Sequence, residues 1–276
     1  LFAILMLNML TSILVALLIS VIINLVGFII AFKFKTDKLT DFSYSLSFIT
    51  VNTTVLALAG DLSLAKFTLL FMVTLWALRL GTHLLIRIRE WGSDNRFDAM
   101  RGDFIKFLSF WMIQAVTVWV VSVSSIQFFN LKSSTNFGII SALGILIFSK
   151  GLIIETVADI SLFRFSKRNK KKGKDDFMQS GIWSISRHPN YLGEITVWLG
   201  LWIFTLQSVN LTQAIIGAIS PIFIFTMLRF VSGTPRLEAK AEKKWGKQKD
   251  YLNYKRQTDL IFPSIKFIKT RILKRT

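Results

Sequence analysis

Long apolar stretches separated by short polar segments dominate the pattern along the chain. A helix needs about 20 mostly apolar residues to cross the hydrocarbon core of a bilayer, and it satisfies its backbone hydrogen bonds internally. The pattern therefore predicts an all-α fold, a polytopic membrane bundle of about seven transmembrane helices. The predicted spans lie at 10–32, 43–60, 64–86, 105–129, 137–160, 191–207 and 211–231.

The basic tail, at about 236–276, has a different pattern. Leu237, Ala241 and Trp245 follow one another at i, i+4 and i+8, which places them on one face of a continuous helix. This is typical of a basic amphipathic helix lying on a membrane surface, but the segment could instead be a lid that closes a cofactor cavity. Neither a Pro/Gly/Ser-rich linker nor an internal repeat interrupts the chain, so a single domain over 1–276 is predicted.

Composition and charge support this picture and add an orientation. The chain is 52% apolar and 13% aromatic, and its mean hydropathy of +0.51 is too high for an ordinary soluble domain. The formal net charge of +18 comes from basic residues concentrated in alternate loops and in the tail. If the amino terminus lies outside, these basic segments all face the cytosol. We expect an integral membrane protein of the bacterial inner membrane or the endoplasmic reticulum, with a cytosolic carboxyl terminus. Topology and attraction to anionic lipid explain the charge without nucleic acid.

The residue types that the chain lacks exclude several kinds of chemistry. It has no cysteine, which rules out disulfides, cysteine-ligated zinc, iron–sulfur clusters and a cysteine nucleophile. His83 and His188 are its two histidines, too few for a histidine-rich metal site. Neither GxGxxG nor GxxxxGK[ST] occurs, so a nucleotide would not be held by a Rossmann or P-loop fold.

The stretch SRHPNYLGE places several polar side chains at the mouth of an apolar segment. Pro189 suits the first turn of a helix, whose amino-terminal amides would form an anion site beside Arg187 and His188. Asn190 and Glu194 are four residues apart and share a helical face. A carboxylate about one turn inside the apolar region needs a partner, so this stretch is the first candidate site.

Two further groups are candidates. Glu155 and Asp159 have i, i+4 spacing near the predicted cytosolic end of a span, and they could hold ribose hydroxyls or form ion pairs with arginines across the bundle. Trp76, Arg79 and His83 form one stripe of the third predicted span. An arginine within the membrane indicates function unless it snorkels to the interface.

The chain carries, in order, the motifs TDFSYSLSF, WALRLGTHLLIRIREWGSDNRFDAMR, ETVAD, GIWSISRHPNYLGE, FVSGTPRLEAKAEKKWG and YLNYKRQTDLIFP. Their order and spacing, over most of the chain after about Thr40, resemble the membrane family related to steroid 5-alpha-reductase, in particular its uncharacterised DUF1295-type branch. The RHPNYLGE element is also similar to that of the sterol reductases and the isoprenylcysteine carboxyl methyltransferases. The first motif looks like a degenerate Asp-x-x-Trp-Gly stretch of the same branch.

The resemblance implies a bundle that holds NADPH in a cytosolic cavity and takes a lipophilic enone-type substrate from the bilayer. By position, Asn190 and Glu194 match family residues near the nicotinamide, and Asp159 matches a cofactor contact. The remaining candidates for cofactor binding are Arg79, Arg96, Arg101, Arg164, Arg187, His188, Tyr191 and Arg229.

One departure from the family concerns the substrate. The steroid enzymes polarise the substrate carbonyl with a tyrosine of the third span and a glutamate of the second. Here Trp76 occupies the third-span position, and the second span offers Tyr44 and Asn52. Tyr44 is therefore the candidate hydrogen-bond donor, and the departure argues against a 3-oxo-4-ene steroid as substrate.

These features predict an NADPH-dependent reductase of an activated carbon–carbon double bond in a lipophilic substrate, with a donor that stabilises the enolate oxygen. An S-adenosylmethionine-dependent methyltransferase of lipids or isoprenylcysteine-type substrates is the alternative, because RHPNYLGE and the basic tail suit both. A non-enzymatic protein that binds membrane lipid is the third possibility. The arginines outnumber what the single carboxylate of S-adenosylmethionine's amino acid moiety requires. Their number therefore favours NADPH, which is rich in phosphate.

Overall fold

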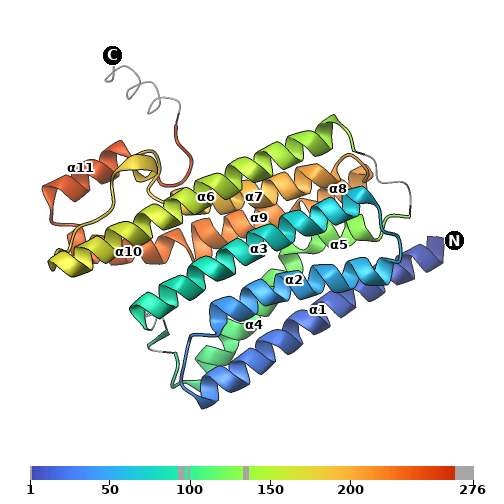
Figure 1. The fold of residues 1–276 in the computed structure, drawn as a ribbon, viewed down its shortest axis with the longest axis horizontal. Coiled ribbons are helices and arrows are strands. Elements are labelled where there is room, and N and C mark those ends of the chain that lie inside the picture. Colours follow the sequence, from blue (N-terminus) through green and yellow to red (C-terminus); the bar gives the residue numbers. More distant parts are fainter. Residues whose placement is uncertain (1, 93–96, 99, 133–136, 265–276) are drawn as a thin grey trace. The chain divides into compact units, whose positions relative to one another are not determined.

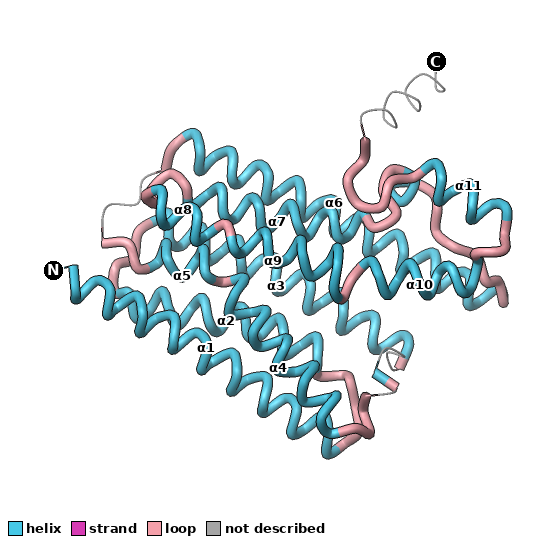
Figure 2. The backbone as a smooth tube through the Cα atoms, turned by 180° about the vertical axis from the view of Figure 1, so that it is seen from behind, coloured by secondary structure: helices cyan, strands magenta, loops and turns pink. Residues whose placement is uncertain are grey.

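The structure, a computed structural model, describes residues 2–92, 97–98, 100–132 and 137–264. These residues form helices and no strand (Figures 1 and 2), apart from an isolated parallel bridge between Ser186 and Asp259. The elements are α1 (Phe2–Lys33), α2 (Thr40–Ala59), α3 (Leu64–Trp91), α4 (Phe104–Val121), α5 (Val123–Phe129), α6 (Ile139–Lys172), a 3-10 turn (Gly181–Ser184), α7 (Pro189–Thr205), α8 (Leu211–Gly217), α9 (Ile219–Thr226), a π turn (Met227–Val231), α10 (Thr234–Trp245) and α11 (Lys249–Gln257).

Six helical segments of the described chain are long and apolar enough to cross a membrane. The remaining predicted span corresponds to α7, whose 17 residues fall at the lower end of the length required for a crossing. The prediction of an all-α, polytopic membrane protein is therefore confirmed. The six segments are Met9–Lys33, Thr40–Ala59, Leu64–Trp91, Phe104–Val121, Ile139–Lys172 and Leu211–Trp245.

Two predicted spans are interrupted where the hydrophobic pattern shows no break. The span at 105–129 is divided between α4 and α5 at Ser122, whose carbonyl accepts a hydrogen bond of 2.9 Å from the hydroxyl of Ser125. The span at 211–231 is divided into α8, α9 and the π turn. Pro221, in the first turn of α9, lacks an amide hydrogen and crowds the carbonyl four residues earlier, which favours an interruption just before it.

The tail forms two helices, so the expected single amphipathic helix is wrong. α10 ends at Trp245, a turn begins at Gly246, and α11 starts at Lys249. Glycine destabilises a helix interior because it has the most backbone freedom to lose, and this favours a break here. The two parts can therefore pack in different directions.

Two compact units divide the chain, and each is described by itself. Unit 1 comprises Leu1–Leu146 and Leu199–Pro221, and unit 2 comprises Ile147–Trp198 and Ile222–Thr276. In unit 1, α1 packs against α2 and α4, and α2 packs against α3. The expected single domain stays a prediction.

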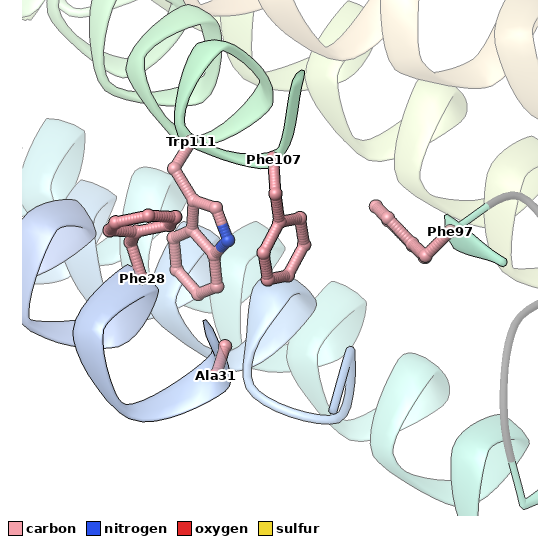
Figure 3. Close-up of a cluster of buried hydrophobic side chains, with 5 residues drawn as sticks. All are labelled: Phe28, Ala31, Phe97, Phe107 and Trp111. Atoms are coloured by element: carbon pink, nitrogen blue, oxygen red, sulfur yellow. The ribbon is translucent and has the colours of Figure 1, made fainter. Parts of the chain in front are cut away.

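An aromatic cluster holds α1 against α4 in unit 1 (Figure 3). Its buried members are Phe28 and Ala31 of α1, Phe107 and Trp111 of α4, and Phe97. The Phe107 and Trp111 rings meet edge to face, with centroids 6.0 Å apart. This packing buries large side chains that the bilayer would otherwise solvate.

A neutral hydrogen-bond network also joins the helices of unit 1. The side-chain nitrogen of Asn24 donates to Ser47 Oγ at 3.1 Å and to the carbonyl of Ser20 at 2.8 Å. The side-chain oxygen of Asn24 accepts from Nε2 of Gln114 at 2.8 Å. This Gln114 nitrogen also donates to the carbonyl of Thr40 at 3.0 Å. All these side chains are buried, so the network connects α1, α2 and α4 through satisfied polar groups.

In unit 2, α6 and α7 touch through glycines. A Cβ on Gly193 of α7 would lie 2.5 Å from the backbone nitrogen of Glu155, and a Cβ on Gly151 of α6 would lie 2.6 Å from that of Val197. No side chain fits at either point. The two backbones approach closely, as is common where small residues line a contact between membrane helices.

Candidate functional site

The loop before α7 is bound by the tail of the chain. The backbone nitrogen of Arg187 donates to the carbonyl of Asp259 at 2.9 Å, and that of His188 donates to the carbonyl of Leu260 at 3.1 Å. Pro189 then begins α7, as predicted. The pairing with the tail therefore fixes the point at which this helix starts.

Glu238 of α10 links the two charged side chains of this loop. Its Oε2 lies 3.0 Å from Nη2 of Arg187, and its Oε1 lies 2.8 Å from Nε2 of His188. The side chains of Arg187 and Glu238 are only 14% and 21% exposed, so solvent screens their charges less than it screens a surface ion pair. One carboxylate thus positions two consecutive residues of the candidate site.

Arg187 also binds the carboxyl end of α11. Its Nη1 donates to the carbonyl of Lys255 at 2.9 Å and lies 3.3 Å from that of Thr258. These carbonyls lack partners within the helix, so the guanidinium caps them. Arg187 therefore joins the loop, α10 and α11, while its role as a phosphate contact stays a prediction.

Aromatic side chains tie α6 and α11 to the same region. Trp183 of the 3-10 turn is buried, and its Nε1 lies 3.2 Å from both the carbonyl of Ala158 and the hydroxyl of Ser161 in α6. Tyr254 of α11 donates its hydroxyl to the carbonyl of Trp183 at 2.6 Å. These bonds fix the turn in front of the Arg187 loop.

Phe177 is the centre of a second aromatic contact, between the segment after α6 and the tail helices. Its ring centroid lies 5.2 Å from that of Tyr251, 5.6 Å from that of Tyr254 and 5.8 Å from that of Trp245. Burial raises the pKa of Tyr251 above its usual value, and the carboxylate of Glu238 raises that pKa further.

Asn190 is the predicted residue with the clearest unused bonding capacity. Its Oδ1 is buried and has no hydrogen-bond partner within the described part of the chain. A buried acceptor in this state costs about 1–3 kcal/mol, so a ligand or water is expected there. Tyr191 next to it stacks on His188, with centroids 5.5 Å apart and an interplanar angle of 14°.

The three predicted carboxylates of α6 and α7 differ in burial. Glu155 is 2% exposed, whereas Asp159 and Glu194 are half-buried. The backbone contact at Gly193 brings Glu155 next to the first turns of α7. None of the three is an isolated charge, since each takes part in an interaction within the protein. The expectation that Glu194 has a partner is thus confirmed.

Two predicted arginines of unit 2 lie in different surroundings. Arg229 belongs to the π turn, where its guanidinium lies 4.9 Å from the ring centroid of Phe230. The hydroxyl of Thr234 donates to the carbonyl of Arg229 at 2.8 Å and closes the turn. π turns occur frequently at functional sites. Arg164 is exposed on α6.

In unit 1, Tyr44 belongs to a row of aromatic rings. It meets Phe48 edge to face at 5.1 Å, and Phe48 meets Trp76 in the same way at 5.1 Å. Tyr44 is half-buried and Trp76 is fully buried, so the row connects α2 with α3. Arg79 is half-buried one turn further along α3.

Arg101 forms ion pairs in unit 1. Its Nε lies 3.1 Å from Oδ1 of Asp37, which is buried, and its Nη2 lies 2.6 Å from Oδ1 of Asp98. These pairs connect the loop after α1 with the segment before α4. Arg96, also predicted to bind the cofactor, lies outside the described residues.

Glu238, Trp183 and Tyr254 belong to the site although no sequence pattern assigned them a role. A signal existed for Glu238, an acidic residue in a strongly basic helical segment. Its partner could not be inferred, because His188 is 50 residues away along the chain.

A family model described as "Protein of unknown function (DUF1295)" matches residues 27–258. The chain belongs to the DUF1295 family. The predicted branch is thereby confirmed, and the region shared with the family contains the loop, Glu238 and α11 of this DUF1295 protein. No curated protein and no solved structure matches the chain.

Proposed function

We propose that this DUF1295 protein is an NADPH-dependent reductase of an activated carbon–carbon double bond in a lipophilic substrate. The observation that carries the proposal is the buried Oδ1 of Asn190, which has no partner among the described residues and follows the loop held by Glu238. The resemblance to the steroid 5-alpha-reductase-related family supports the choice of reaction. We further propose that the tail and the site face the cytosol, because the basic residues are sided.

The chemistry of these residues fits the nicotinamide end of NADPH. A carboxamide has two N–H donors, and Asn190 Oδ1 is a buried acceptor. Glu194 lies one turn further along the same helix, where it would limit the rotation of a bound polar group. Bound NADPH would supply the hydride.

The remaining residues have distinct roles in this proposal. Arg164 and Arg229 are the better candidates for the phosphates, because both terminal nitrogens of Arg187 are engaged by protein oxygens. Tyr44 belongs to unit 1, where its contact with Phe48 would hold the ring in place, and its role as the donor to the substrate oxygen stays a prediction.

The test measures NADPH binding to the purified protein in detergent, by the fluorescence of the reduced nicotinamide. Asn190→Ala should weaken binding about twofold to tenfold, the effect of losing one neutral hydrogen bond. Asn169→Ala is the matched control, because that exposed amide bonds the carbonyl of Asp176 at 3.3 Å. Equal affinities in the two variants would contradict the role of Asn190. Binding of S-adenosylmethionine without NADPH would make the protein a methyltransferase instead.

A further inference from the structure

A polar depression of about 280 Å³ lies on the surface of unit 2. Most of its lining comes from α11 and the residue that ends this helix, at positions i, i+3, i+4, i+7 and i+8, which form one helical face. The lining residues are Gln179, Asp250, Asn253, Tyr254, Gln257 and Thr258. They do not include the residues assigned to the nicotinamide.

The walls of this depression are held in place by bonds behind them. The hydroxyl of Tyr254 donates to the carbonyl of Trp183, and its ring packs against Phe177. The carbonyl of Thr258 lies 3.3 Å from Nη1 of Arg187. A site whose walls are already ordered loses less conformational entropy on binding.

Thr258 shows unused bonding capacity at this site. It is 3% exposed, and its Oγ1 has no hydrogen-bond partner among the residues that the structure describes. Asn253 Oδ1 accepts from Arg256 Nη2 at 2.7 Å, which leaves the Nδ2 of Asn253 as a donor. A buried hydroxyl without a partner calls for a bound molecule, a ligand or a water.

The lining chemistry selects against an anion. Asp250 is the one charged side chain among the lining residues, and a carboxylate repels phosphate. The volume is near the lower end of small-molecule sites, about 300 Å³, which suits a nucleoside better than a whole dinucleotide.

Three features match an adenine nucleoside. The side-chain amides of Gln179 and Gln257 offer paired donors and acceptors of the kind that recognise N6 and N7 of adenine, and Asn253 adds a donor. A carboxylate such as Asp250 binds ribose hydroxyls, and an aromatic ring such as Tyr254 offers a surface for a base. We propose that the depression formed by α11 and Gln179 binds an adenine nucleoside.

The nucleoside has two possible sources. It could be a free nucleoside, or the adenosine part of S-adenosylmethionine, whose ribose hydroxyls are free. The adenosine of NADPH carries a 2′-phosphate, which Asp250 would repel. The first source is independent of the proposed function, and the second would favour the methyltransferase over the reductase. In either case Thr258 connects the depression, through Arg187, to the loop before Asn190.

The test measures binding of radiolabelled adenosine to the full chain in detergent, by equilibrium dialysis. The double variant Asn253→Ala/Gln257→Ala should bind adenosine at least about tenfold more weakly, and Thr258→Val about threefold to tenfold more weakly. Gln248→Ala, an exposed amide just before the same helix and outside the depression, should leave affinity unchanged. Thermal unfolding of each variant shows that it is folded.

Competition then identifies the source. If S-adenosylmethionine displaces adenosine, the site holds the adenosine part of that cofactor; if both bind at once, it is a separate nucleoside site. Displacement by NADPH would contradict the selection against phosphate. Adenosine binding without NADPH binding would sink the proposed reductase but support this inference. No saturable adenosine binding, equal affinity in the double variant, or preferential binding of glucose would overturn it.

Discussion

The two units use polar side chains in different ways. In unit 1 the buried network around Asn24 and Gln114 is neutral and joins neighbouring helices. In unit 2 the bridge from Glu238 to Arg187 and His188 is charged and joins a loop to the distant tail. Neutral hydrogen bonds hold membrane helices together at little desolvation cost, whereas partly buried charges are costly unless paired. The neutral network therefore serves as scaffold, whereas the charged bridge belongs to the candidate site.

The units also differ in how their helices meet. In unit 1, α1 and α4 are separated by the large rings of Phe28, Phe107 and Trp111 (Figure 3). In unit 2, α6 and α7 touch at Gly151 and Gly193, where no side chain fits. Two backbones in direct contact leave no room for the helices to shift. The contact therefore fixes the positions of Glu155, Asn190 and Glu194 closely.

The largest effect is expected at the charged bridge. Glu238→Ala leaves the donors of Arg187 and His188 without their shared acceptor and should lower the free energy of unfolding by about 3 kcal/mol. Thermal unfolding in detergent measures this effect. Glu242→Ala, which removes a 47% exposed partner of Lys255 one turn later, should cost less than about 1 kcal/mol. Equal losses would remove the distinction between bridge and surface pair.

The glycine contact should give the next largest effect. A Cβ at Gly193 meets the backbone of Glu155 at 2.5 Å, so Gly193→Ala should destabilise the protein by about 2 kcal/mol through overpacking. It should also reduce NADPH binding, because α7 carries Asn190. Gly102→Ala is the control, since a Cβ there meets nothing within 4 Å. A fully stable Gly193→Ala protein would show that α6 and α7 can separate without loss.

The neutral network should respond more weakly. A double-mutant cycle with Asn24→Leu and Gln114→Leu should give a coupling energy of about 1 kcal/mol, typical of hydrogen bonds between membrane helices. Cofactor binding should be unchanged in these variants. A coupling as large as the loss at Glu238, or a loss of NADPH binding, would show that the network around Asn24 contributes more than scaffold.

The smallest effect concerns alkaline pH. Because the pKa of Tyr251 is raised above 10.0, the unfolded chain loses this proton first. The contribution of Tyr251 to the free energy of unfolding is therefore fully present below about pH 10 and is lost as the pH rises toward the raised pKa. Tyr251→Phe removes this loss, so its melting temperature should fall less than that of the parent between about pH 9.5 and pH 11. Parallel curves would argue against the raised pKa.

The hydrophobic pattern by itself determined the fold class and most of the spans. Stretches of about 20 apolar residues can only be buried in a membrane as helices, whatever their neighbours are. The same local logic placed the start of α7 at Pro189. It did not reveal the break at Ser122, which goes with a local hydrogen bond of the Ser125 hydroxyl, or the turn at Gly246, which the backbone freedom of glycine favours. Neither changes the hydrophobic pattern.

Only the tertiary structure decided which polar residues share a site. The sequence singled out Arg187, His188 and Asn190, but it could not show that Glu238 holds the first two, since the partner lies 50 residues beyond His188. It also could not show that Asn190 keeps a buried acceptor without a partner. Side-chain pairing between distant segments depends on how helices pack, and packing follows from three-dimensional shape rather than from spacing along the chain.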